Sequence, residues 1–239
     1  MYFLKQLFGA RRSSSGSRQG DLPVPVRELG PSDFGPFAAF WRDRPKAYLS
    51  FLGMGTPDVQ PALTSLSHVL RSTADGHRYI EVMLQGRNWR PHLVASVAAL
   101  LSDDRAAYAP ALWRTFDCGS WVAPQLAVAL YLSDPEFSRE AKHRIAGRCP
   151  VTEAANLPAI ERSVRSRNVA SLLRVVSYLP SETNWVVSEL KHPEVRALIK
   201  ADSDSSGDIA DWWLKAVQTE YGRLGCDLRS NAGALCTFV

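Results

Sequence analysis

The stretch that decides the fold runs from Asn88 to Gly147 and reads NWRPHLVASVAALLSDDRAAYAPALWRTFDCG, then SWVAPQLAVALYLSDPEFSREAKHRIAG. Each half begins with a cap-type residue and a tryptophan, Asn88-Trp89 and Ser120-Trp121. An apolar run at helical spacing follows, a break containing aspartate interrupts it, and a second apolar run comes after the break. Asn and Ser favour helix starts because their side-chain oxygen accepts a hydrogen bond from an N–H of the first turn. Each half therefore predicts a helix, a short turn and a second helix.

The same spacing extends over most of the chain. Cap-type residues recur every 32 positions, at Thr56, Asn88, Ser120, Thr152 and Asn184. Trp185 follows the last of them, in the same phase as Trp89 and Trp121. A fixed period of this size is typical of helical repeat proteins. The sequence therefore predicts an all-α fold built from helix pairs, with a helix starting at each of these positions.

The turn within the second half carries a family resemblance. Leu130–Ala141 reads LYLSDPEFSREA, and Leu190–Leu198 echoes it as LKHPEVRAL. An Asp-Pro turn followed by an apolar residue, an arginine and an alanine resembles the turn between the two helices of a HEAT-type repeat. The resemblance covers residues 56 to 200. It implies a curved right-handed stack of HEAT-like helix pairs, whose concave face holds a protein or nucleic-acid partner.

The segments around these units are less regular. Phe34–Leu52 has the aromatic and aliphatic residues of a helical segment that covers one end of the stack, and a terminal helix is expected at Ile209–Ala216. Tyr79–Leu84 fits a helix or a strand, because its β-branched and aromatic residues are common in strands. Pro158 is expected to interrupt the helix of the fourth unit, since proline lacks a backbone N–H. Residues 226–239 show no pattern.

The N-terminal residues differ in composition from the rest. Gly9–Val26 is rich in Ser, Gly and Arg, and such a segment buries too little apolar surface to order itself. We therefore expect a flexible basic tail over residues 1–30 and an α-helical repeat domain over residues 31–239. Met1–Phe8 is apolar except for Lys5 and Gln6 but lacks the flanks of a secretory signal. It is either a short helix that docks on a membrane surface or a partner, or a tail that packs on its own protein or stays disordered.

The composition is that of a globular chain and leaves the partner open. The chain has 239 residues, 46% of them hydrophobic, and a net charge of +4, which suits an acidic protein surface as well as a nucleic-acid backbone. No segment reaches the roughly 20 apolar residues that span a bilayer. Four scattered cysteines without a C-x-x-C pair favour reduced thiols in a cytoplasmic protein, and the build rich in alanine and arginine favours a bacterial one. No pattern defines an oligomeric state.

The sequence contains no motif that establishes catalysis or metal binding. Asp202–Ile209 matches the first eight positions of an EF-hand loop, but the twelfth, which should be an acid, is Trp213. A helix start capped by Asp208 or a neighbour is the expected structure there. No second ligand lies at metal spacing from any of the histidines, and neither a G-x-S-x-G elbow nor a phosphate-binding loop is present. We therefore predict a protein without enzyme activity, cofactor or metal. The histidines are His68, His77, His92, His143 and His192.

Tryptophans and arginines are the candidate binding residues. The three tryptophans that share a phase are either anchors along one edge of the stack or fillers of equivalent gaps between units. The basic region of the middle of the chain is either a solvated helix face or a ligand site; it comprises Arg139, Arg144, Arg148, Arg162, Arg165 and Arg167. The predicted partner-binding set is Trp89, Arg90, Trp121, Arg148 and Trp185.

A second resemblance gives the alternative. Some alkylpurine DNA glycosylases are small stacks of HEAT-like repeats that use an aspartate flanked by aromatic residues and an arginine, and Trp113, Asp117, Arg148 and Trp185 are similar to that pattern. The resemblance implies that the acid stabilises a cationic sugar while the arginine holds a phosphate. Asp117 also fits a turn residue, because Cys118 and a glycine follow it. The sequence favours a protein-binding domain, with an immunity protein that neutralises a cognate toxin as its sharper form.

Overall fold

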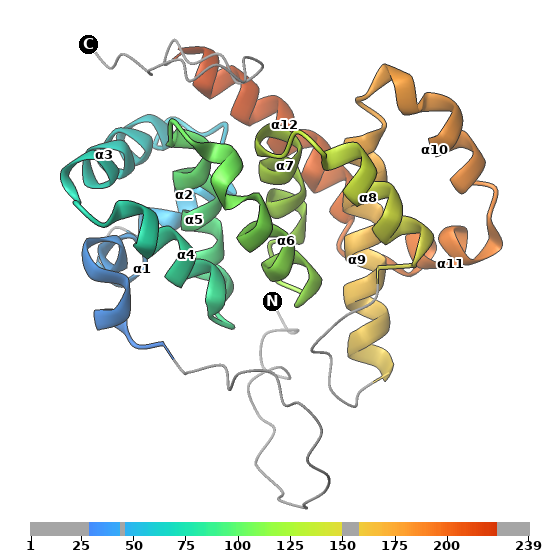
Figure 1. The fold of residues 1–239 in the computed structure, drawn as a ribbon, viewed down its shortest axis with the longest axis horizontal. Helices are drawn as coiled ribbons and strands as arrows, with labels where there is room; N and C mark the ends of the chain where they lie inside the picture. Colours follow the sequence, from blue (N-terminus) through green and yellow to red (C-terminus); the bar gives the residue numbers. More distant parts are fainter. Residues whose placement is uncertain (1–28, 44–45, 150–157, 224–239) are drawn as a thin grey trace, which may run out of the picture.

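The computed structural model describes residues 29–43, 46–149 and 158–223 (Figure 1). Within these ranges every element is a helix, which confirms the all-α prediction. The ambiguous segment Tyr79–Leu84 is helical and belongs to α4, Gly76–Gln85. Most of the predicted N-terminal tail, the predicted helix start at Thr152 and residues 226–239 lie outside the described residues.

The N-terminal part is more divided than predicted. The expected single segment Phe34–Leu52 consists of a 3-10 helix and two short α-helices: η2 (Pro31–Ala38), α1 (Ala39–Arg42) and α2 (Tyr48–Leu52). Gly35 bends η2, because its φ of 50° lies in the left-handed region and a Cβ there would meet the ring of Tyr79 at 2.6 Å. A second break follows at Asp43, where the backbone is extended.

The central helices follow the predicted order of helix, turn and helix. They are α3 (Val59–Ser72), α4, α5 (Trp89–Leu101), η3 (Arg105–Tyr108), α6 (Ala109–Asp117), α7 (Ala123–Ser133) and α8 (Phe137–Ala146). α7 lies between α5 and α9 (Figure 1). Every residue from 91 to 100 in α5 and from 123 to 130 in α7 is buried. Mostly apolar residues on all sides of both helices allow this burial, since neighbouring helices pack around them.

The C-terminal part begins with a long helix. Its elements are α9 (Pro158–Val176), η4 (Pro180–Glu182), α10 (Thr183–Glu189), α11 (Pro193–Ala201) and α12 (Ser206–Arg223). The prediction that Pro158 interrupts a helix is wrong, because α9 starts at this residue. Proline is well tolerated at the first helical position, where its missing N–H needs no partner.

The last helix folds back over the central ones. α12 packs on α7 and α9 (Figure 1). Tyr221 near its end donates a hydrogen bond to the carbonyl oxygen of Val97 in α5 (3.2 Å), and the indole of Trp213 donates to Phe51 in α2 (2.8 Å). α12 therefore contacts α2, α5, α7 and α9. The right-handed repeat geometry itself stays a prediction.

The helix start predicted at Asn88 is correct, because its side chain caps α5. Asn88 Oδ1 accepts the N–H of Arg90 at 3.1 Å, and Ser120 Oγ accepts the N–H of Val122 at 3.3 Å. The starts predicted at Thr56, Ser120 and Asn184 are wrong. α3 begins only at Val59 and α7 only at Ala123, each after a turn. Asn184 is the second residue of α10, because the 3-10 turn at η4 has already made the backbone helical.

The acidic loop before α12 is a helix cap. Asp202 accepts hydrogen bonds from the backbone N–H (2.6 Å) and the hydroxyl (2.8 Å) of Ser206. The expected helix start is present, but Asp202 rather than Asp208 bonds to its first residue, because α12 begins at Ser206 and Asp208 lies within it. Asp204 and Asp208 make ion pairs with Arg167 and Arg174 of α9, at 2.8 and 3.0 Å. These carboxylates join α12 to α9.

Candidate functional site

Three aromatic side chains gather where α2, α5 and α7 begin. The rings of Trp89 and Trp121 have centroids 4.8 Å apart, and those of Tyr48 and Trp89 are 5.6 Å apart in an edge-to-face arrangement. The starts of these helices meet because α5 packs against both α2 and α7. We call the group of Tyr48, Trp89, Arg90 and Trp121 the aromatic end. It brings together three of the predicted partner-binding residues, and Tyr48 is the member that the sequence analysis missed.

Arg90 is held in place by the aromatic rings. Its guanidinium carbon lies 4.8 Å from the ring centroid of Trp89 and 5.7 Å from that of Tyr48. Its Nε donates a hydrogen bond to the Tyr48 hydroxyl at 3.2 Å. Within the described part of the chain, no carboxylate pairs with it. The guanidinium is thus fixed in orientation while its terminal nitrogens have no anionic partner there.

The exposed member of the aromatic end is Trp121. Its side chain is 50% exposed, whereas Trp89 is partly buried and Tyr48 is buried. Trp89 fills the space between neighbouring helices, as one of the two alternatives for the periodic tryptophans requires. Trp121 instead presents its ring at the surface on a packed base, which is the arrangement of a binding anchor.

A buried histidine positions the backbone below Trp121. His92 Nε2 lies 2.7 Å from the carbonyl oxygen of Gly86, and Nδ1 lies 2.9 Å from the hydroxyl of Ser120. Because the carbonyl only accepts, Nε2 carries the proton and Nδ1 accepts from Ser120, whose oxygen in turn accepts the N–H of Val122. Burial lowers the pKa of His92 to about 4, which keeps the ring neutral.

The other two predicted binding residues lie elsewhere. Arg148 follows α8 and pairs with Glu194 of α11 at 3.1 Å and with Glu189 of α10 at 3.6 Å. Trp185 lies in α10, with the ammonium of Lys142 at 5.9 Å from its ring centroid. The structure therefore divides the predicted set into the aromatic end and a pair of residues on the α8, α10 and α11 side.

The glycosylase-like residues are also only partly brought together. Both carboxylate oxygens of Asp117 accept from Arg144, each at 2.9 Å, and the same guanidinium lies 3.9 Å from the ring centroid of Trp113. The Trp113 indole donates to Asp134 at 2.7 Å. Arg144, which the sequence marked only as part of a basic region, is thus the centre of this group. With both oxygens engaged, Asp117 joins α6 to α8.

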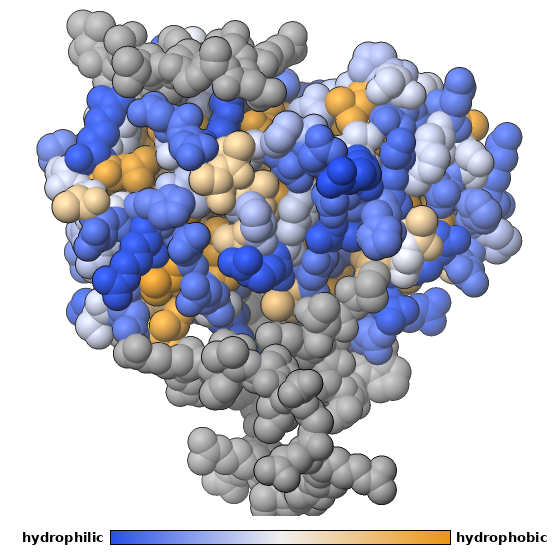
Figure 2. All heavy atoms as spheres, in the orientation of Figure 1, coloured by the Kyte–Doolittle hydropathy of each residue, from blue (hydrophilic) through white to orange (hydrophobic). Residues whose placement is uncertain are grey.

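Most of the basic region is paired with carboxylates. Ion pairs join Arg139 to Glu136, Arg165 to Glu161 and Arg167 to Asp204. Figure 2 shows hydrophilic residues over much of the surface around α8 and α11, with hydrophobic ones as scattered spots. This arrangement agrees with a solvated face rather than a ligand site.

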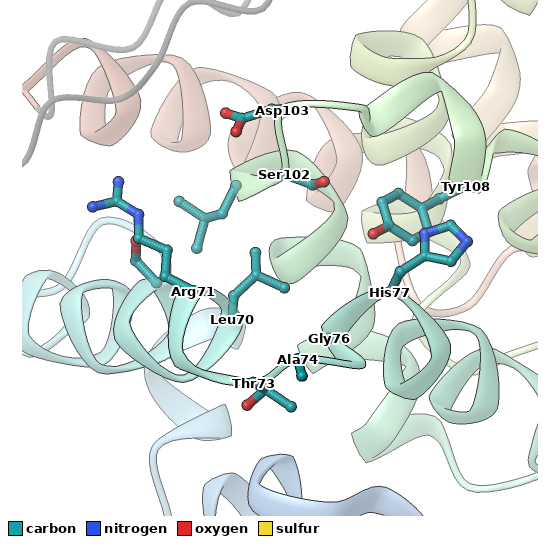
Figure 3. A pocket seen from close by; sticks show the side chains of 11 residues that line it. Leu70, Arg71, Thr73, Ala74, Gly76, His77, Ser102, Asp103 and Tyr108 are labelled. Carbon is teal, nitrogen blue, oxygen red and sulfur yellow. The ribbon is translucent and has the colours of Figure 1, made fainter.

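A hollow of about 310 Å³ lies between α3, α4 and the loop after α5 (Figure 3). His77 packs on the ring of Tyr108 with centroids 4.8 Å apart. Figure 3 shows Asp103 pointing away from His77, and no described hydrogen bond joins Ser102 to His77, so these side chains form no catalytic triad. No sequence pattern predicts this hollow, because its lining residues come from separate loops and helix ends.

Comparisons with protein families, with curated protein sequences and with solved structures found no match to this chain. Within the described ranges, no group of three or more His, Cys, Asp or Glu side chains could hold a metal ion. No helix there is long and apolar enough to cross a membrane. Function is therefore inferred from the geometry of the side chains alone.

Proposed function

We propose that this protein is a non-catalytic binding protein that docks another protein on its aromatic end. The observation that carries the proposal is Trp121, a half-exposed ring that rests on Trp89 beside the fixed guanidinium of Arg90. Tryptophan, tyrosine and arginine dominate the hot spots of protein interfaces. The two aromatic residues bury a large area with little loss of side-chain freedom, and arginine adds directed hydrogen bonds. The aromatic end combines all three.

The proposal places the interface at the ends of helices rather than on a concave face. α12 covers α7 and α9, so a partner has less access to the central helices from that side. The alternative of a glycosylase-like DNA-binding protein has less support, because Asp117 is engaged by Arg144 and Arg148 by two glutamates. DNA binding would be detected as nucleic acid recovered with the tagged protein.

The sharper form of the proposal is an immunity protein that neutralises a cognate toxin in a bacterial cytoplasm. Such a protein needs only a stable fold and one high-affinity surface, and the aromatic end offers the side chains for that surface. Co-expression with the product of a neighbouring gene tests this form. Rescue of growth by the wild type and its loss with Trp121→Ala is the expected result.

The binding proposal is tested by recovering partners from nuclease-treated native cells with three tagged proteins: wild type, Trp121→Ala and Trp212→Ala. Trp212 is the matched control, since it is also an exposed tryptophan (46%) but lies on α12. We expect one protein that is retained by the wild type and by Trp212→Ala and is lost with Trp121→Ala. Equal recovery with both variants, or recovery of nucleic acid alone when nuclease is omitted, contradicts the proposal.

A further inference from the structure

Arg90 of the aromatic end differs in its contacts from four other partly buried arginines. Arg144, Arg148, Arg165 and Arg167 each have a carboxylate within ion-pair distance. Arg90 has instead two aromatic rings and a tyrosine hydroxyl. A guanidinium removed in part from water is stabilised by an anion, and a planar fork of donors matches a carboxylate.

The geometry prepares Arg90 for such an anion. The stacking on Trp89 and Tyr48 and the hydrogen bond from Nε restrict the side chain before any ligand arrives. Less conformational freedom is then lost on binding, which favours affinity. The exposed Arg87 and Lys46 precede Trp89 and Tyr48 closely in the chain and add positive charge near the same helix starts.

An apolar anchor lies next to this cation. The ring centroid of Trp89 lies 4.8 Å from the guanidinium carbon of Arg90 and 4.8 Å from the ring centroid of Trp121, so one ligand segment of a few residues can meet both Arg90 and Trp121. Trp121 offers an exposed ring for an apolar side chain. The aromatic end therefore combines a fixed cation and an apolar surface within the span of a few ligand residues.

We infer that the aromatic end binds an acidic segment of its protein partner, in which a carboxylate pairs with Arg90 and a neighbouring apolar side chain packs on Trp121. This inference rests on the proposed function and names the chemistry of the partner. A nucleic-acid backbone fits less well, because phosphate binding draws on many cations in a row and the aromatic end has one fixed guanidinium.

The test uses random peptides displayed on phage as the probe. They are selected against the wild type, Arg90→Gln, Trp121→Ala and the control Arg114→Gln, which changes an exposed arginine of α6. We expect the wild type and Arg114→Gln to enrich peptides with Asp or Glu beside an apolar residue, and Arg90→Gln to lose the acidic preference. Circular dichroism and thermal unfolding verify that all variants fold.

A double-mutant cycle then measures the pairing itself. For an enriched peptide, Arg90→Gln and replacement of the peptide acid by its amide should each weaken Kd about tenfold or more, and the two changes together should weaken it little further. Independent, multiplying effects overturn the assignment of Arg90 to the carboxylate. Arg90→Lys should retain only part of the affinity, because lysine lacks the stacked fork.

The two proposals fail in different ways. If peptides depend on Trp121 but carry no acid and ignore Arg90, the acidic partner is wrong and the binding surface stands. If no enriched peptide depends on Trp121, the proposed function fails with it. If a short DNA duplex binds through Arg90 with affinity that falls steeply between about 50 and 200 mM salt, the partner is a nucleic acid and both proposals are overturned.

Discussion

Two regions of this molecule use arginine in different ways. On the side formed by α6, α8, α9, α10, α11 and the start of α12, which we call the ion-paired side, Arg144, Arg148 and Arg167 bind carboxylates of other elements. At the aromatic end, Arg90 lies on rings and has no carboxylate among the described residues. In the first region arginine joins helices together, and in the second we propose that it pairs with a partner. The number of arginines in the sequence does not distinguish these roles.

The comparison is tested most strongly by changing one arginine of each region to methionine. Arg144→Met should lower the free energy of unfolding by about 3 kcal/mol, because it leaves Asp117 partly buried without its cation. Arg90→Met should lower it by less than about 1 kcal/mol, since it leaves no charge unpaired. Urea denaturation measures both values. Equal losses contradict the division of roles.

The protein should also lose stability in acid, because His92 is buried below the aromatic end. Because burial lowers the pKa of His92 from 6.5 to about 4, the unfolded chain binds its proton first, and stability falls as the pH drops from about 6.5 to 4. Between pH 7 and 4.5 this loss amounts to about 2.5 kcal/mol. Urea denaturation of the wild type and of His92→Gln at pH 7 and at pH 4.5 isolates the contribution of His92, because the other titratable groups are the same in both proteins. A similar slope in both contradicts the prediction.

Trp89 and Trp121 should separate stability from binding. Trp89→Ala removes a ring packed between Tyr48 and Trp121 and should lower the free energy of unfolding by about 2 kcal/mol. Trp121→Ala should lower it by less than about 1 kcal/mol but abolish partner recovery. Thermal unfolding and the recovery experiment measure the two effects. A Trp121→Ala variant that unfolds as easily as Trp89→Ala makes Trp121 a packing residue.

The smallest effect is expected at the start of α12, on the ion-paired side. Asp202→Ala removes two hydrogen bonds to Ser206 and should lower the free energy of unfolding by about 1 kcal/mol. Asp204→Ala removes only an exposed partner of Arg167 and should lower it by about 0.5 kcal/mol or less. If Asp204→Ala is the more damaging change, the ion pair contributes more to the attachment of α12 than the cap does.

The sequence predicted the central helices well and their neighbours less well. α5 and α7 were predictable as helices from their long apolar runs, and Asn88 also marks the start of α5. The starts predicted at Thr56, Ser120 and Asn184 and the interruption predicted at Pro158 were wrong, because turns, a 3-10 helix and a proline-first helix each move a helix start away from the regular spacing. The 32-residue period reflects how the helices pack, whereas turns and 3-10 helices at the helix starts do not follow that period.

The candidate site was predictable only in part. The shared phase of Trp89 and Trp121 correctly placed them at neighbouring helix starts, since equivalent positions of adjacent helices lie side by side. The same logic failed for Trp185, which lies on α10 and outside the aromatic end. Tyr48 was missed, because its contact with Trp89 depends on how α2 packs against α5.

The sequence by itself determined what arises from short-range hydrogen bonds and helical spacing: the all-α class, the cap at Asn88, and the apolar runs of α5 and α7. Tertiary structure alone decided which arginines meet carboxylates, how α12 folds back and which tryptophan stays exposed. These outcomes depend on contacts between residues far apart in the chain. Tyr221 and Val97 are 124 positions apart, and Asp117 and Arg144 are 27 apart. No local pattern specifies such pairs, because they form only when whole helices pack.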